Sequence, residues 1–363
     1  MSASTKTPGG APLEKAAGRA MTSRVVRAGA VSVRWEPRVA AVCAALALFA
    51  AGAAVLVVGS GDFPISPPDV VAALVGQGDR ATEFIVQTLR LPRAVTGLLV
   101  GLALGLSGAI FQSMSRNPLG SPDLIGFTQG GASGALLQIL VFGGGAVAIT
   151  ASSAAGAVLT ALAVYLVAYR RGGGVVGVRL VLIGVAAAAM LQALNSYLIT
   201  RAELTEAYEA AFWLTGSLNG RDWDQAVPLA IALAVLVPAA LVLSRSLGMG
   251  ELGDDAAQAL GVRVQRTRLL LVIVGVGLVA AATAAAGPVP FVALAAPQLA
   301  RRLTRRAGAQ LLPAALTGAA LLACGDLISL HLPVAIPVGV VTGVLGGVYL
   351  AWLLAASGRR GMG

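Results

Sequence analysis

The chain alternates long apolar runs with short polar breaks. Charge-free runs extend from Leu124 to Tyr169, from Leu180 to Thr200, from Gln225 to Ser244 and from Leu269 to Ala300. A helix needs about 20 apolar residues to cross the hydrocarbon core of a bilayer, so each run holds one or two spans. The pattern predicts an all-α, polytopic membrane protein of about ten helices, near 38–58, 94–115, 122–142, 147–169, 179–200, 225–244, 267–286, 290–304, 311–330 and 335–356.

The same pattern predicts three parts of the chain. Residues 1–37 are rich in Ala, Gly, Ser and Arg without apolar periodicity, which predicts a disordered, basic cytoplasmic tail. Residues 38–358 form the ten-helix transmembrane domain, and 359–363 a short cytoplasmic tail. The run from Val39 to Val58 is longer than a signal-peptide core and is expected to stay as the first helix.

Positive charge orients these helices. With ten spans and a cytoplasmic N-terminus, 21 of the 26 Lys and Arg residues fall on the cytoplasmic side and five fall outside. Cytoplasmic segments carry an excess of Lys and Arg, so both termini are expected to be cytoplasmic. The five outer residues are Arg80, Arg90, Arg93, Arg201 and Arg221.

Composition narrows the classes of function. The chain is 57% hydrophobic and 12% charged, with a formal charge of +10. Its basic residues lie between apolar runs rather than along one polar face, and aromatic residues make up only 5%, so nucleic-acid binding is not expected. Cys43 and Cys324 have no second ligand residue at metal spacing, so no metal site is predicted.

No Gly-x-x-x-x-Gly-Lys-Ser/Thr motif occurs in the sequence. A chain without this phosphate-binding loop is not expected to hydrolyse ATP or to bind a cofactor of its own. Any ATP used in its function would be hydrolysed by another chain.

A stripe of glycines marks the second predicted span. Gly97, Gly101, Gly105 and Gly108 lie on one helix face, where small residues allow another backbone to approach closely. We expect a central, tightly packed helix here.

The polar loop between the sixth and seventh spans predicts a short helix. Asp254 suits its N-cap, acidic residues suit its first turn, and Gly261 suits its C-terminal exit. By these signals alone it is either a rigid knob that fits a cleft in a partner or an ordinary amphipathic connector. The segment comprises Gly250, Glu251, Leu252, Gly253, Asp254, Asp255, Ala256, Ala257, Gln258, Ala259, Leu260, Gly261 and Val262.

Five motifs in order resemble the FecCD/BtuC permease family over about residues 38–356. They are the segment above together with Leu89-Arg90-Leu91-Pro92-Arg93, Arg116-Asn117-Pro118-Leu119-Gly120-Ser121-Pro122-Asp123, Trp213-Leu214-Thr215-Gly216-Ser217-Leu218 and Pro337-Val338-Gly339. Two stretches resemble permeases of the ferric-enterobactin type and related siderophore permeases: Asn117 to Asp123 followed by Ile125-Gly126-Phe127, and Ala296-Pro297-Gln298.

The resemblance implies a type II ABC importer of the bacterial cytoplasmic membrane that carries ferric siderophores. The chain would pair with a second permease, receive its cargo from an extracytoplasmic binding protein and contact two ATP-binding subunits. Residues 250–262 match the family's coupling segment against the ATPase. Arg90 and Arg93 match arginines that face acidic residues of the binding protein, although as interfacial arginines they could instead anchor the second helix at the lipid headgroups.

Departures from the family pattern bear on whether the second permease is identical to this chain. Gln298 stands where many members have His, and the turn after Asp326 is short, with His331 near the place of a third docking arginine. A heterodimer, whose other permease supplies the missing contacts, is therefore favoured over a homodimer. Asn117, Pro118, Asn219 and Gln298 are the candidates to line a pathway.

Alternatives remain at this point. Vitamin B12 or haem could be the cargo of the same architecture. Gly131-Ala132-Ser133-Gly134 resembles a rhomboid protease motif, with His331 as the base, but that histidine lies in a predicted outer turn. A secondary transporter usually has intramembrane carboxylates, which the charge-free runs do not supply. On composition alone, a lipid flippase or a structural membrane protein also fits.

Overall fold

The structure is a computed structural model that describes residues 24–28, 31–61, 63–169, 177–334 and 336–358. The chain divides into two compact units, 1–41 and 42–363. In the first unit, β1 (Arg24–Ala28) and β2 (Val31–Trp35) pair antiparallel, with Val26 opposite Val33. These paired strands differ from the predicted disorder, because the β-branched valines in both segments favour strands. Residues 1–23 and 359–363, both predicted as tails, lie outside the described residues.

Every other described element is helical. The helices and two π-helical segments are α1 (Pro37–Gly59), α2 (Pro67–Leu74), α3 (Arg80–Phe84), η2 (Ile85–Arg90), α4 (Leu91–Ser115), α5 (Phe127–Leu137), η3 (Gln138–Phe142), α6 (Ala146–Ala168), α7 (Gly177–Arg201), α8 (Leu204–Leu214), α9 (Trp223–Gly250), α10 (Asp254–Ala259), α11 (Val264–Ala286), α12 (Val292–Thr304), α13 (Leu311–His331) and α14 (Val338–Gly358).

Each of the ten predicted segments contains a helix. Among the described residues, seven helices are long and apolar enough to cross a membrane, and 127–142 and 338–352 are shorter apolar helices. The second span begins earlier than predicted, because the helix continues back to Arg80. The third begins later, at Phe127, because Pro122 and the left-handed Gly126 (φ 86°) keep the preceding loop out of a helix. α8 lies between the fifth and sixth predicted spans, where the pattern predicts no helix.

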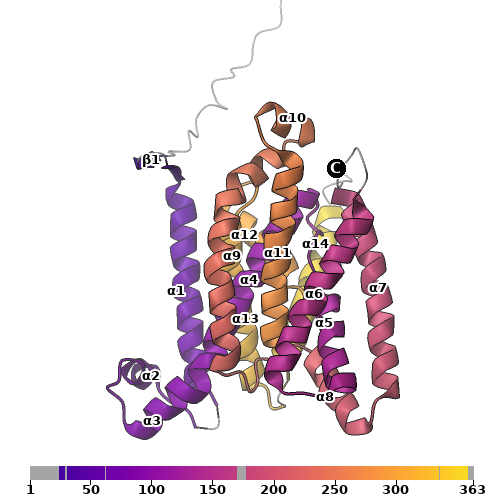
Figure 1. Ribbon diagram of the computed structural model, residues 1–363. Helices are drawn as coiled ribbons and strands as arrows, with labels where there is room; N and C mark the ends of the chain where they lie inside the picture. Colours follow the sequence, from indigo (N-terminus) through magenta and orange to yellow (C-terminus); the bar gives the residue numbers. More distant parts are fainter. Residues whose placement is uncertain (1–23, 29–30, 62, 170–176, 335, 359–363) are drawn as a thin grey trace, which may run out of the picture. The chain divides into compact units, whose positions relative to one another are not determined.

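Three helices form the centre of the second unit (Figure 1). In the most apolar 18-residue stretch of each helix, the buried share is 78% for the helix that contains α4, 72% for α11 and 67% for α13. The corresponding share for α7 is 11%. The exposed apolar side chains of the outer helices, such as Leu182, Met190 and Val242, suit a lipid environment or a partner subunit. The buried face of α4 packs directly against α13, α11 and α12.

The glycine stripe lies where α4 meets its neighbours. Added methyl groups at Gly101 and Gly105 would overlap the backbone carbonyls of Gly318 and Ala314 in α13, and one at Gly108 would overlap that of Ala293 in α12. Gly97 faces the side chain of Leu218. These close approaches are those of helix packing, which requires residues without a side chain at the crossing points.

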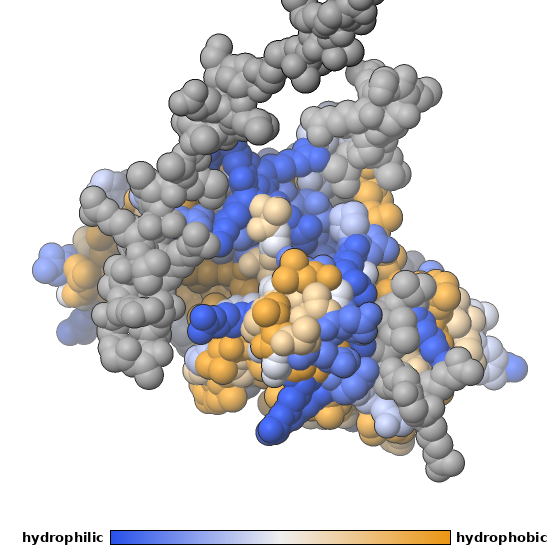
Figure 2. Space-filling view, turned by 90° about the horizontal axis from the view of Figure 1, so that it is seen from above, coloured by the Kyte–Doolittle hydropathy of each residue, from blue (hydrophilic) through white to orange (hydrophobic). Residues whose placement is uncertain are grey.

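The second unit has two chemically different ends. At one end, the α10 end, α10 projects between α9 and α11; α2, α3 and α8 lie at the opposite end, the α2 end (Figure 1). Seen from the α10 end, hydrophilic residues surround an apolar projection (Figure 2). The exposed leucines of the segment that contains α10 are Leu252 and Leu260, with 68% and 59% of their surface accessible.

Candidate functional site

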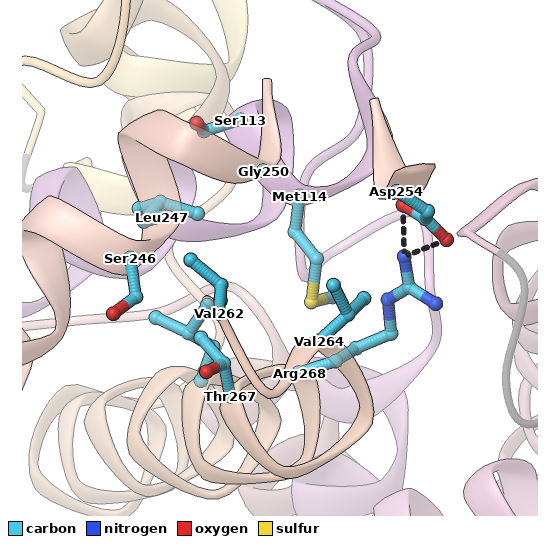
Figure 3. Close-up of a pocket in the computed structure, with 11 residues that line it drawn as sticks. Ser113, Met114, Ser246, Leu247, Gly250, Asp254, Val262, Val264, Thr267 and Arg268 are labelled. Carbon is cyan, nitrogen blue, oxygen red and sulfur yellow. Dashed lines mark hydrogen bonds and ion pairs between the residues drawn. The ribbon is translucent and has the colours of Figure 1, made fainter. Parts of the chain in front are cut away.

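The segment 250–262 forms a short helix, as predicted, held by one ion pair. Arg268 of α11 donates from one guanidinium nitrogen to both carboxylate oxygens of Asp254, each at 3.0 Å (Figure 3). Arg116 lies 4.0 Å from the same carboxylate. Asp254 therefore does not cap the helix as predicted; Gly253 (φ 109°) takes the N-cap position, where no side chain caps the helix, and Gly261 (φ 85°) forms the exit.

A polar network connects this segment to α4 and α12. Ser113 of α4 donates to the Glu251 carboxylate. Its neighbour Gln112 donates to the Leu294 carbonyl at 2.9 Å and accepts from Gln298 at 2.6 Å and from Arg301 at 3.2 Å. Because Gln112 and Ser113 are buried, these bonds fix the end of α4 to its neighbours.

The predicted docking residues meet at the α2 end. Arg90, Arg93 and His331 line one cavity of about 880 Å³, together with Asn219 and Arg221. Residues far apart in the sequence thus form a single polar, basic recess. Arg221 is one of the five basic residues predicted on the outer side, but no motif gives it a role. It lies more than 100 residues from Arg93 in the sequence, so its position in the same cavity could not be predicted.

Arg90 and Arg93 also bond within the chain. Arg90 donates to the carbonyls of Val58, at 3.0 Å, and Phe63, at 2.8 Å, and so holds the end of α1 and the loop that follows. Arg93 forms a two-bond ion pair with Asp326 of α13, at 3.2 and 2.7 Å. Both contacts join helix ends, and they leave fewer donors for a partner than free arginines would have.

Arg221 is held differently. Its Nε donates to the Ser217 carbonyl at 3.2 Å, and the side chain forms no ion pair among the described residues. Burial lowers the pKa of Arg221 from its ordinary value, and the neighbouring Asp222 opposes that shift. Arg221 keeps its positive charge at neutral pH, because arginine side chains are effectively always protonated in proteins.

A second cavity brings three of the five motifs together. It measures about 320 Å³ and is lined by Asp123, Thr215 and Gly339, with Thr128 and Pro288 among the others. The Gly339 N–H donates to the Gly216 carbonyl at 3.0 Å, which joins the start of α14 to the loop after α8. Motifs that lie more than 200 residues apart therefore build one pocket wall.

Asp123 is the charged group of this second cavity. Its carboxylate accepts from the Thr128 hydroxyl at 2.7 Å and from the backbone N–H of Phe291. Among the described residues, no cationic side chain lies within ion-pair distance of it. The adjacent Gly126 lies against Gly184 and Ala188, two to three turns inside α7, so the loop 116–126 re-enters the helical bundle.

The predicted pathway residues fall in different places. Asn117 accepts from the Leu119 N–H in the turn after α4, and Gln298 donates to the Pro118 carbonyl at 3.2 Å. Asn219 lines the cavity at the α2 end. The structure does not bring these four residues into one wall.

Ser133 and His331, the pair of the protease alternative, are not hydrogen-bonded to each other. The Ser133 hydroxyl donates to the Gln129 carbonyl in its own helix. The Nδ1 of His331 lies 2.9 Å from the Leu327 carbonyl, and the ring lines the cavity at the α2 end. A nucleophilic serine needs its base within hydrogen-bond reach, so this arrangement does not support a protease.

Known proteins resemble this chain in sequence and in fold. The FecCD transport family matches residues 37–356. The ferric enterobactin transport system permease protein FepG of Escherichia coli (strain K12) is 44% identical over 303 residues, which cover 83% of this chain and 91% of that protein. The Fe(3+)-citrate import system permease protein YfmE of Bacillus subtilis (strain 168) is 36% identical over 310 residues, 84% of this chain and 92% of the relative.

A cobalamin permease is a more distant relative. The cobalamin import system permease protein BtuC of Halobacterium salinarum is 33% identical over 274 residues, covering 75% of this chain and 73% of the relative. Among solved structures, an inward-facing chain described as a metal-chelate type ABC transporter superposes with a TM-score of 0.78 at 28% identity, covering 87% of this chain and 99% of that one. Sequence and architecture agree: the chain belongs to the FecCD transport family.

Proposed function

We propose that this chain is the membrane-spanning permease of an ABC importer that carries ferric siderophores across the bacterial cytoplasmic membrane. The observation that carries the proposal is the 44% identity to a ferric enterobactin permease across 83% of the chain. Relatives for iron citrate and siderophores rank above the cobalamin permease in similarity. ATP would be hydrolysed by separate subunits.

The two ends of the helical unit suit two kinds of partner. The arginine-rich α10 end would be cytoplasmic, in keeping with the positive-inside bias, which places both termini in the cytoplasm. Leu252 and Leu260 would then insert into a cleft of the ATPase, while the Asp254–Arg268 ion pair holds α10 on the permease.

The cavity at the α2 end would receive the extracytoplasmic binding protein. Arg90, Arg93 and Arg221, with His331 beside them, would supply the basic groups of this recess that complement acidic side chains, although Arg93 is already paired with Asp326. A heterodimer with a second, non-identical permease remains our preferred assembly, with a homodimer as the alternative.

The second cavity is our candidate for the wall of the pathway. Its polar side chains are one carboxylate, that of Asp123, and the neutral groups of Thr128, Gln129 and Thr215, which suits transient contact with a large chelate rather than tight metal binding. Among the described residues, no cluster of three metal-ligating side chains occurs. Iron would therefore stay within its chelator.

The test is uptake of radiolabelled iron by a strain that lacks this gene. Cells receive one ferric siderophore at a time and are complemented with the gene, with or without its ATPase. Rescue by one class of chelate that requires the ATPase supports the proposal and names the cargo. Unchanged iron uptake after deletion contradicts it and directs the search to vitamin B12 or haem.

A further inference from the structure

The end of α12 carries a cation that is paired with aromatic rings rather than with a carboxylate. The guanidinium carbon of Arg302 lies 4.6 Å from the centre of the Trp352 ring and 5.7 Å from that of Tyr349, both in α14. Arg302 is exposed, and among the described residues no carboxylate lies within 4 Å of it. Arg305, also exposed, follows at the C-cap of the same helix.

These side chains lie near the α10 end of the second unit. Arg301, next to Arg302, bonds Gln112 near the last turn of α4, at the α10 end. Trp352 is 55% exposed and lies about 21 Å along α14 from Val338, by the rise of an α-helix. Exposed Trp and Tyr together with Arg are the usual composition of a membrane interface.

An apolar cavity begins beside this cluster and runs deeper into the unit. It has a volume of about 240 Å³ and is lined by residues of α12, α13 and α14, including Leu299, Leu321 and Leu345. Tyr349 belongs to both features, since its ring faces Arg302 and also lines the cavity. A cationic group and an apolar slot therefore share one wall.

We propose that this place binds an anionic phospholipid, with the phosphate on Arg302 and Arg305 and one acyl chain in the cavity between α12 and α14. A phosphate supplies the negative charge that the described side chains do not place beside Arg302, and guanidinium groups bind phosphate well. Burial of the methylene groups of an acyl chain is favourable, so the cavity favours a lipid over a free phosphate.

A structural role for the arginines alone explains less. Cations at the C-terminal end of α12 do stabilise its dipole. That role needs neither the two aromatic rings of α14 nor an apolar cavity beside them. An acidic surface of the ATPase is the other possible partner, but it would not fill the cavity.

The experiment is native mass spectrometry of the full chain, purified with its partner subunits. The complex is incubated with phosphatidylglycerol or with phosphatidylcholine of the same acyl chains. We expect retained phosphatidylglycerol and little phosphatidylcholine, and about tenfold weaker retention in Arg302→Ala, since one charged hydrogen bond is lost. Arg302→Lys keeps the charge and should retain part of the binding.

Matched variants separate the two halves of the site. Arg245→Ala removes the same charge from an exposed position of α9 and should leave lipid retention unchanged. Leu345→Trp fills the cavity without changing charge and should weaken retention. Thermal unfolding of each variant checks that it folds.

Four results would overturn the proposal: equal retention of both lipids, equal loss in Arg302→Ala and Arg245→Ala, displacement of the lipid by millimolar glycerol phosphate, or loss of the ATPase subunits in Arg302→Ala with lipid retention intact. None of them depends on which cargo the transporter carries, so the inference can fail while the proposed function holds.

Discussion

Arg93 and Asp326 lie 233 residues apart and form two hydrogen bonds, at 3.2 and 2.7 Å, that join α4 to α13. Only 2% of the Asp326 side chain and 18% of the Arg93 side chain are exposed. Removal of one partner from a buried ion pair strongly destabilises a protein, because the other charge stays buried without compensation.

Replacement of Asp326 by asparagine should therefore destabilise the protein by about 3 kcal/mol, because it leaves the Arg93 cation partly buried without a counter-charge. Thermal unfolding in detergent measures the loss. The double variant Arg93→Met with Asp326→Leu should recover most of it. If Asp326→Asn unfolds at the wild-type temperature, the pair has no structural role.

The basic cavity predicts a charge effect on docking. Arg221→Glu should weaken binding of the extracytoplasmic partner by about tenfold, mainly through slower association, because attraction at the rim becomes repulsion. Surface plasmon resonance at two salt concentrations measures this. Arg201→Glu is the control, since Arg201 is an exposed arginine of the same end that does not line the cavity. Equal effects of both variants would mean that only net charge matters.

The glycine contacts predict a packing effect. Gly105→Val should destabilise the protein by roughly 2 kcal/mol or more, because the new side chain overlaps the Ala314 carbonyl. Gly52→Val in α1 has open space around it and should fold normally. Yield of monodisperse protein and its unfolding temperature compare the two. Similar behaviour of both variants would show that α4 and α13 can separate.

The coupling segment predicts a loss of communication rather than of folding. Asp254→Asn should weaken the attachment of α10 to α11 by about 2 kcal/mol, because Arg268 loses a charged acceptor. The position of α10 should then be less fixed. ATP hydrolysis in proteoliposomes should then continue while uptake falls. Asp255→Asn, on the same turn but without a bond to Arg268, should keep the two coupled. Normal uptake by Asp254→Asn would contradict this role.

Several elements could be predicted from the sequence because their signals are local. The long apolar runs predict α1, α6 and α13 within one residue at each end, and the acidic residues and Gly261 predict α10. The rest depends on tertiary contacts. α8 has too weak a pattern to distinguish it from a loop, and the re-entry of 116–126 depends on its contacts with α7 and Phe291.

The site shows the same division. The motif that contains Arg90 and Arg93 could be recognised in the sequence, and both residues line one cavity. Their partners, Val58 and Asp326, could not be predicted, since nothing local in the sequence indicates which distant carbonyl or carboxylate each arginine meets. Asp123 falls at the start of the predicted span 122–142, whereas in the structure its carboxylate accepts from the backbone N–H of Phe291, at the start of α12.

The shortness of α12 bears on how the protein is made. Thirteen residues span about 20 Å, less than the hydrocarbon core, and the helix ends in two arginines. Such a segment is not expected to pass from the translocon into lipid by itself, because it buries less apolar surface in the bilayer than a complete span of about 20 residues would. It has to wait until α4 and α13, against which it packs, have assembled a surface that accepts it. Biogenesis of this permease is therefore expected to be sequential, with α12 among the last helices to be integrated.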